Sequence, residues 1–229
     1  MTRNSLRRKQ PENNTFFLYG ASREVVIQDI DSTSQNEYIT AYKDSWNYGV
    51  IMLRCFDQAQ MPVASGAFND AERLVSLHFR MRGDDFRKNR YDVKTLAFLE
   101  QHEVKDGAFA HLCKYSYDAP SDLKPESRKG FDFYRICLQD NSILDAVDRA
   151  NSFVKLKPLM LYIAVHELIH VIRFSTGTID FDAPQKEKEQ EEKIVHRLTR
   201  SALQPVKQND LEIIMDCFDD AFTINDLYN

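Results

Sequence analysis

The sequence Leu161-Tyr-Ile-Ala-Val-His-Glu-Leu-Ile-His-Val-Ile-Arg-Phe174 is the stretch around which the rest of the chain is expected to fold. It is apolar at nearly every position and has neither glycine nor proline, which is typical of a helix buried on all sides. Within it, His166, Glu167 and His170 form the pattern H-E-x-x-H. Residues four apart on a helix lie one above the other, so both imidazoles project from one face. One divalent ion can then bind both rings, and Glu167 can reach a metal-bound water as a general base.

The alternative is a core helix whose two histidines and one glutamate are satisfied by ordinary hydrogen bonds. Burying three ionisable groups costs on the order of several kcal/mol unless each is paired, and a bound metal offsets that cost directly. The pattern therefore predicts a metal site on this helix.

The composition is that of an ordinary globular protein, with 43% apolar and 28% charged residues. A chain of 229 residues is long enough for one domain with a substantial core and short for two. Its formal net charge of −5 gives no reason to expect binding to nucleic acid or to an anionic membrane. A basic cluster between residues 80 and 90 contains Asp84 and Asp85, which favours a self-paired surface turn over a nucleic-acid patch.

The sequence also bears on compartment. Its first residues are basic but lack the apolar segment of a secretory signal, and the longest apolar run, 159–165, is too short to span a bilayer. The cysteines include no C-x-x-C pair, so we expect reduced, mostly buried thiols. They are Cys55, Cys113, Cys137 and Cys217. These features predict a cytoplasmic protein with no membrane segment.

Residues 1–14 are polar and are expected to form a flexible tail, with residues 15–229 forming a single domain. Apolar periodicity and turn residues place the remaining elements. Strands are expected at 15–19, 24–28 and 131–138. Helices are expected at 32–60, 69–81, 93–102, 141–151 (or a turn), 158–177, 194–203 and 209–218. We expect a connector at 62–66, irregular chain at 105–130, and a solvated linker or first helical turn in the charged run 184–193.

Two histidines leave the shell of a divalent metal incomplete, because catalytic zinc sites usually take a third protein ligand. A third histidine six residues after His170 is excluded, since Thr176 stands there. The remaining candidates lie about twenty residues downstream, on a second predicted helix. They are Glu189, Glu191, Glu192 and His196.

At these positions the sequence resembles the HExxH zinc metallopeptidases with a downstream glutamate ligand, the gluzincins, and in particular the small bacterial peptidases that cleave repressor proteins. Their second motif runs roughly E-x-x-A-N-x-F-A-x-x-L-L-x-P. Aligned at Pro205, Glu192 falls on the ligand position and His196 on the asparagine, while Val195 and Thr199 differ from the usual small residues. The resemblance covers about forty residues, from Leu161 to Pro205.

The resemblance implies Zn²⁺ bound by His166, His170 and Glu192. His196, one turn after Glu192 on the same face, would lie beside the metal without binding it, or beside the substrate as an electrophilic helper. Two alternatives stay open: a three-histidine site that uses His196, and a surface on which Glu192 and His196 are ordinary solvated charges.

The expected fold is α+β and predominantly α, with a zincin-like metal helix at the centre of one metallopeptidase domain and a small β-sheet beside it. The strand at 131–138 precedes the metal helix, and its edge is expected to pair with an extended substrate. The expected activity is hydrolysis of a peptide bond in a peptide or protein substrate, with Glu167 as general base. Candidates for stabilising the oxyanion are His196, a tyrosine and Arg173.

Two other functions were weighed. A zinc-stabilised, non-catalytic scaffold or interaction protein could use the same ligands, but it would have no need of Glu167. A repair-type protease recruited to DNA is disfavoured by the acidic balance of the chain.

Overall fold

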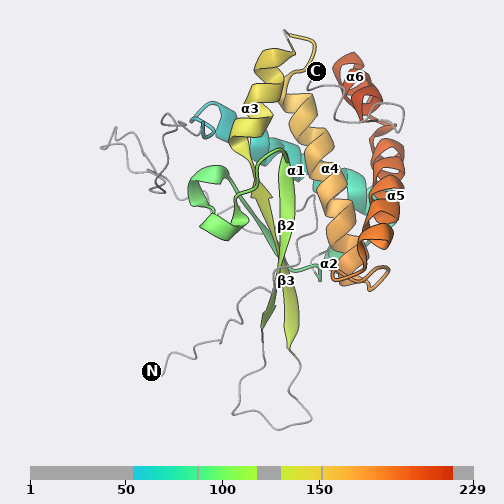
Figure 1. Cartoon of the computed structure of the whole chain (residues 1–229). Coiled ribbons are helices and arrows are strands. Elements are labelled where there is room, and N and C mark those ends of the chain that lie inside the picture. Colours follow the sequence, from blue (N-terminus) through green and yellow to red (C-terminus); the bar gives the residue numbers. More distant parts are fainter. Residues whose placement is uncertain (1–53, 87, 118–129, 151, 219–229) are drawn as a thin grey trace.

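The computed structural model describes residues 54–86, 88–117, 130–150 and 152–218 (Figure 1). In these ranges helices predominate over one small three-stranded sheet, so the expected α+β, predominantly α class is confirmed. The helices are α1 Gln60–His78, α2 Gly83–Phe86, α3 Asp140–Arg149, α4 Leu156–Ser175, α5 Gln185–Leu203 and α6 Asn209–Cys217. The strands are β1 Tyr91–Lys94, β2 Ala110–Tyr117 and β3 Phe131–Leu138, and two 3-10 turns lie at Leu96–Phe98 and Gln101–Glu103.

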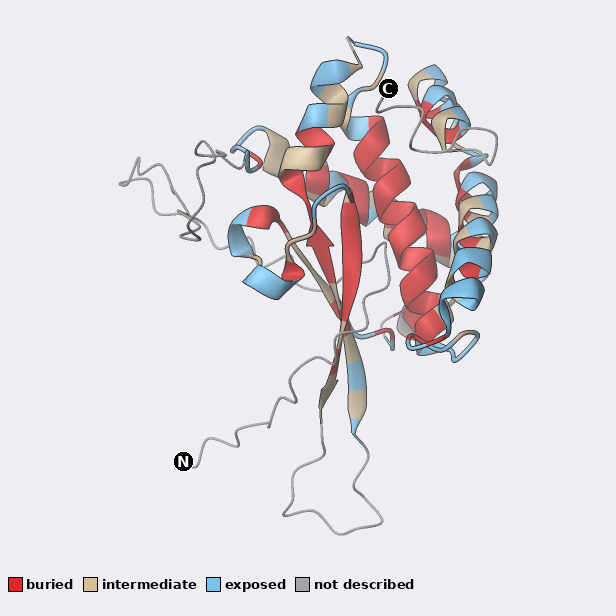
Figure 2. Cartoon of the chain, in the orientation of Figure 1, coloured by how far each residue is buried: buried red, intermediate tan, exposed pale blue. Residues whose placement is uncertain are grey.

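Helix α4 lies at the centre of the fold and is buried along nearly its whole length (Figure 2). It has Pro158 in its first turn, where no intrahelical N–H bond is lost, and it ends just before Gly177, whose φ of +68° suits a glycine. By length and hydropathy alone α4 would suit a membrane span, but 89% of its most apolar window is buried inside the protein. Its apolar character is therefore accounted for by packing inside the fold.

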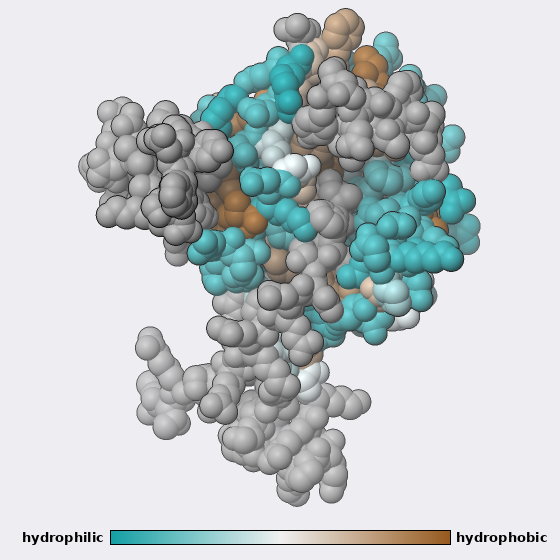
Figure 3. Space-filling model, in the orientation of Figure 1, coloured by the Kyte–Doolittle hydropathy of each residue, from teal (hydrophilic) through white to brown (hydrophobic). Residues whose placement is uncertain are grey.

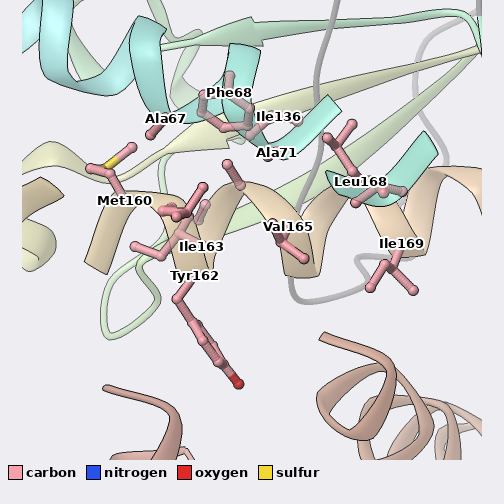
Figure 4. Packing of buried hydrophobic residues seen from close by; sticks show 14 of the residues in the cluster. Ala67, Phe68, Ala71, Ile136, Met160, Tyr162, Ile163, Val165, Leu168 and Ile169 are labelled. Carbon is pink, nitrogen blue, oxygen red and sulfur yellow. The ribbon is translucent and has the colours of Figure 1, made fainter. Parts of the chain in front are cut away.

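Helix α1 packs on one side of α4 through small residues. Figure 4 shows Ala67, Phe68 and Ala71 of α1 over α4, while Tyr162 points to the opposite side, toward the C-terminal helices. Alanine side chains let two helix backbones approach closely. Leu168, which is fully buried on α4, contributes roughly 1.5–3 kcal/mol through burial of its side chain.

The sheet has the order β1-β3-β2, with β1 parallel and β2 antiparallel to β3. Strand β3 is therefore the central strand, although the sequence predicted that its edge would be available to a substrate. That expectation is wrong for half of the strand, because Tyr134–Cys137 pair with β1 on one side and with β2 on the other. The outer edges of the sheet belong to β1 and β2.

The two faces of the sheet differ in composition because side chains alternate along a strand. Tyr134, Ile136 and Leu138 of β3 belong to the main hydrophobic core with α4. The opposite face carries a second, smaller cluster around Cys113, Tyr115 and Cys137. The 3-10 turns lie on that side of the sheet, away from α4 (Figure 1).

Ion pairs attach the 3-10 turns to the second face. The fully buried Glu103 carboxylate accepts hydrogen bonds from Tyr115, from Nη1 of Arg135 at 3.1 Å and from the backbone N–H of Glu100 at 2.8 Å. Arg135 also donates to both oxygens of Asp92 on β1, at 2.8 and 2.6 Å. Charged hydrogen bonds of this kind satisfy buried groups that would otherwise be costly.

Several predicted elements are confirmed and several are not. The strand at 131–138 and the helices over 141–149, 158–175, 194–203 and 209–217 are confirmed, and α5 extends back through the charged run to Gln185. Most of this run lies on the exposed face of α5, which is strongly hydrophilic in Figure 3, but Glu191 is buried. The tail 1–14, the strands at 15–19 and 24–28, and the predicted helix up to residue 53 lie outside the described residues.

The corrections come from tertiary contacts. Residues 62–66 are not a connector but part of α1. Pro62 lies in the first turn, where its missing N–H breaks no helical hydrogen bond, and Gly66 is tolerated within the helix. Residues 54–59 are not helical. Residues 93–102, predicted as a helix, contain the end of β1 and the 3-10 turns, and β2 lies within the supposedly irregular 105–130. Both β1 and β2 form because they pair with β3, and such pairing outweighs the local propensity of a segment for helix or loop.

Candidate metal centre

Helices α4 and α5 bring the two histidines of the H-E-x-x-H pattern against Glu192. His166 and His170 lie on successive turns of α4 and are fully buried, with their Nε2 atoms 3.2 Å apart. Across from them, Glu192 Oε2 lies 3.5 Å from His166 Nε2, and its Oε1 lies 3.3 Å from His170 Nε2. The side chain of Glu192 keeps 23% exposure, but both of its carboxylate oxygens are buried against the histidines.

These distances can be compared with what zinc requires. Nitrogen and oxygen ligands lie about 2.0–2.2 Å from zinc, and tetrahedral geometry then separates neighbouring ligand atoms by about 3.3–3.6 Å. The two histidine nitrogens are 3.2 Å apart, and they lie 3.5 and 3.3 Å from Oε2 and Oε1 of Glu192 respectively, each within a few tenths of an ångström of such an edge. Each of these pairs of atoms is therefore spaced as two ligands of one zinc ion would be.

The electrostatics of the group favour the metal-binding forms of His166 and Glu192. Burial, together with the neighbouring His196, lowers the pKa of His166 well below its usual value. Burial alone would raise the pKa of Glu192, but His170 and His166 overcome that effect and lower it to about 2. A neutral imidazole facing an ionised carboxylate is the pairing of forms that coordinates a divalent ion.

Glu167 lies next to this group and is fully buried. Neither oxygen of its carboxyl group has a hydrogen-bond partner among the residues that the structure describes. Burial, and then the negative charge of Glu192, raises the pKa of Glu167 well above its usual value. An unpartnered buried carboxyl group costs stability, and groups of this kind concentrate at functional sites.

His196 borders the centre one turn after Glu192. Its Nδ1 lies 2.8 Å from the hydroxyl of Tyr162, and its ring centroid lies 4.4 Å from that of His166. A nitrogen of His196 also lies within 4.8 Å of the ligand atoms of His166 and Glu192. Tyr162 stacks on Phe218 at 4.5 Å between ring centroids, which holds the tyrosine on the α5 and α6 side of α4.

Two of the four candidate third ligands are engaged elsewhere. The buried Glu191 receives two hydrogen bonds from Arg173, one of them from Nη2 at 2.8 Å. The exposed Glu189 accepts a bond from Gln185 at 3.2 Å. Arg173, a sequence candidate for the oxyanion, is thus held by Glu191. Consecutive residues on a helix point about 100° apart, which explains why Glu191 and Glu192 have different partners.

Sequence reasoning did not single out two features of the structure. Tyr162 stands four residues before His166, and this helical spacing was a signal that could have placed it beside the histidines. A second group of metal-ligand residues, consisting of His111, Cys113 and Cys137, lies on the sheet. The alternation H-x-C within a strand was its one local signal. No protein-family model, curated protein or solved structure matches the chain.

Proposed function

We propose that this protein is a zinc-dependent peptidase in which His166, His170 and Glu192 bind the metal and Glu167 is the general base. The observation that carries the proposal is the close approach of three side chains: the Nε2 atoms of His166 and His170 lie 3.2 Å apart, and each lies 3.3–3.5 Å from a different oxygen of Glu192. Beside them lies a buried carboxyl group with no hydrogen-bond partner among the described residues. The ligand spacing fits zinc, and the carboxyl group fits proton transfer.

A zinc ion held there would polarise the carbonyl of a peptide bond and make a nearby water a stronger acid. Glu167, in its apolar surroundings, takes the proton from that water and delivers it to the departing amine. The raised pKa of Glu167 suits the first step, because it makes the carboxylate a stronger base toward the water than a carboxylate with an ordinary pKa.

In the proposed mechanism His196 acts on the developing oxyanion. When the Tyr162 hydroxyl donates to Nδ1, the proton of the imidazole resides on Nε2, which can then donate to a negatively charged oxygen. In the reverse arrangement Nδ1 donates to Tyr162, and Nε2 is a potential metal ligand, as a three-histidine site would need. The contact of Glu192 with both metal-helix histidines favours the first arrangement.

The second candidate function is a zinc-stabilised scaffold without catalysis. A structural zinc site has no use for a buried, unpartnered Glu167, and replacing that residue would then remove a cost to stability.

The two functions are separated by Glu167→Gln, with Glu189→Gln on the exposed face of α5 as the matched control. For a peptidase, Glu167→Gln keeps the fold and the zinc content, but cleavage of a denatured protein or a peptide library falls by a factor of about 10² to 10⁴ or more. The control retains wild-type cleavage. If Glu167→Gln cleaves as fast as wild type, the proposed base is wrong; if no form cleaves any substrate, the scaffold is favoured.

A further inference from the structure

A second group of metal-ligand side chains lies on the face of the sheet opposite α4. His111 and Cys113 are two residues apart on β2, so their side chains share a face. Cys137 on β3 is the register partner of His111 and lies on the same face. The pairing of β2 with β3 thus brings together one imidazole and two thiols, although Cys137 is far from the other two residues in the sequence.

The spacing of the sulfur atoms fits a metal better than a disulfide. The Sγ atoms of Cys113 and Cys137 are 3.8 Å apart. Thiolate ligands lie about 2.3 Å from zinc, which separates two of them by about 3.8 Å in a tetrahedral site. A disulfide would need about 2.05 Å between the same atoms. A ring nitrogen of His111 lies within 4.8 Å of both sulfur atoms, so a small movement of the ring completes the set.

His111 supplies an independent reason to expect a ligand. The residue is fully buried, and neither of its ring nitrogens has a hydrogen-bond partner among the described residues. A buried polar group left unsatisfied costs roughly 1–3 kcal/mol. The adjacent polar groups do not relieve it, because Glu103 is engaged by Tyr115 and Arg135.

The surroundings also suit a soft, water-poor site. Cys137 is fully buried and Cys113 nearly so, and Leu99 and Phe133 pack against them. A thiolate is the form of cysteine that binds metals.

We propose that His111, Cys113 and Cys137 form a second metal site, which binds one zinc ion and joins β2 to β3. The group holds three ligands among the described residues, so the fourth position is left to a water or another small ligand. Metal binding releases the protons of the two thiols. The ion stabilises the folded sheet because the unfolded chain does not hold the three ligands together. The site is independent of the proposed peptidase centre, which contains no sulfur ligand.

The sulfur ligands make the two centres separable by spectroscopy. Zinc X-ray absorption of the wild-type protein, purified under reducing conditions and loaded with zinc, is expected to show a Zn–S shell near 2.3 Å beside the Zn–N/O shell near 2.0–2.1 Å. Cobalt(II) substitution is expected to give a thiolate-to-metal charge-transfer band in the near ultraviolet. Both measurements use the wild-type chain, so they do not depend on the folding of a variant.

Variants then assign the ligands. Cys113→Ser and Cys137→Ser are each expected to lose one equivalent of zinc, the Zn–S shell and the cobalt band, while Cys55→Ser, at an exposed cysteine outside the group, keeps all three. Glu192→Ala is expected to keep the Zn–S shell. Absence of a Zn–S shell and of the cobalt band in the wild type overturns the proposal, as does a Cys113–Cys137 disulfide in non-reducing peptide mapping of protein purified without added reductant but with zinc present.

Discussion

At the scale of single residues, the candidate centre depends on which side chain completes the metal shell. Glu192 contacts both histidines of α4 through separate oxygens, whereas His196 is held by Tyr162 at its Nδ1. The two residues lie one turn apart on the same face of α5, so their replacement by alanine should damage packing to a similar degree. A difference between them therefore reports coordination.

We predict that Glu192→Ala loses the zinc bound by His166 and His170 at neutral pH, because one of three protein bonds to the ion is removed. His196→Ala is expected to retain that zinc and to cleave substrate about 10- to 100-fold more slowly. Zinc content by mass spectrometry and cleavage rate, measured on both purified variants, provide the comparison. If His196→Ala is the variant that loses this zinc, the centre uses three histidines and the resemblance to the glutamate-ligand peptidases is misplaced.

At the scale of elements, the pairing of α4 with α5 sets the geometry of the centre. One face of α4 carries His166, His170 and Arg173. Glu192 of α5 contacts the two histidines, and Glu191 of α5 pairs with Arg173. The ion pair between Arg173 and Glu191 lies one turn from the proposed metal and involves a carboxylate that is only 2% exposed. It holds the two helices in the register that brings Glu192 to the histidines.

We predict that Arg173→Met destabilises the protein by about 3–5 kcal/mol, because it leaves the buried Glu191 without its partner. The double variant Arg173→Met, Glu191→Met should recover most of that loss, since two apolar side chains replace the whole pair. Urea unfolding of the wild type and both variants measures the difference. A double variant as unstable as the single one would show that the loss arises from packing around Arg173 and not from the unpaired carboxylate.

At the scale of the whole molecule, buried polar groups connect segments that are distant in sequence. Asp140, at the start of α3, accepts hydrogen bonds from the backbone N–H groups of Phe56 at 2.9 Å and Leu96 at 3.1 Å. Burial raises the pKa of Asp140 to about 6 in spite of these bonds, which act to lower it. The folded state therefore keeps a proton on this carboxyl group at a pH where the unfolded chain, with a pKa of about 3.9, has lost it.

The sign of the resulting pH dependence follows from proton counting. Because the folded state binds more protons between about pH 4 and pH 6, the stability from Asp140 is full below that window and is lost as the pH rises through it. We predict that the excess stability of wild type over Asp140→Asn falls by about 2 kcal/mol from pH 4 to pH 7. Denaturant unfolding of both proteins across this range measures it. An excess that grows with pH would mean that the two N–H bonds outweigh burial.

Metal removal should also lower the stability of the whole folded protein. We predict that chelation lowers the melting temperature and that added zinc restores it, because the buried ligand groups on α4 and α5 lose their common partner. Calorimetry before and after chelation provides the measurement, with magnesium as the control ion that should not restore stability. Purified protein that contains no divalent metal and shows no shift on adding zinc would exclude the site.

The sequence by itself determined those features that depend on local spacing. The buried helix, its H-E-x-x-H pattern and the shared face of Glu192 and His196 are all readable because helical contacts recur every three or four residues. The last two helices were predicted for the same reason, although α5 begins at Gln185 and not at residue 194. The strand at 131–138 was predicted from its aromatic and β-branched residues after Gly130. Pro62 and Gly66 led to the wrong prediction of a connector at 62–66, since the packing of α1 against α4 outweighs the modest cost of one glycine in a helix.

Only the tertiary structure decided which distant residues meet. Neighbouring glutamates on α5 are alike in sequence, and the docking of α5 on α4 alone sends Glu191 to Arg173 and Glu192 to the histidines. Strands β1 and β2 exist because β3 provides the hydrogen-bonding partner, and their pairing brings Cys113 to Cys137. The physical reason is that a helix satisfies its backbone within a few residues, whereas a strand and a site shared by two elements need partners far along the chain.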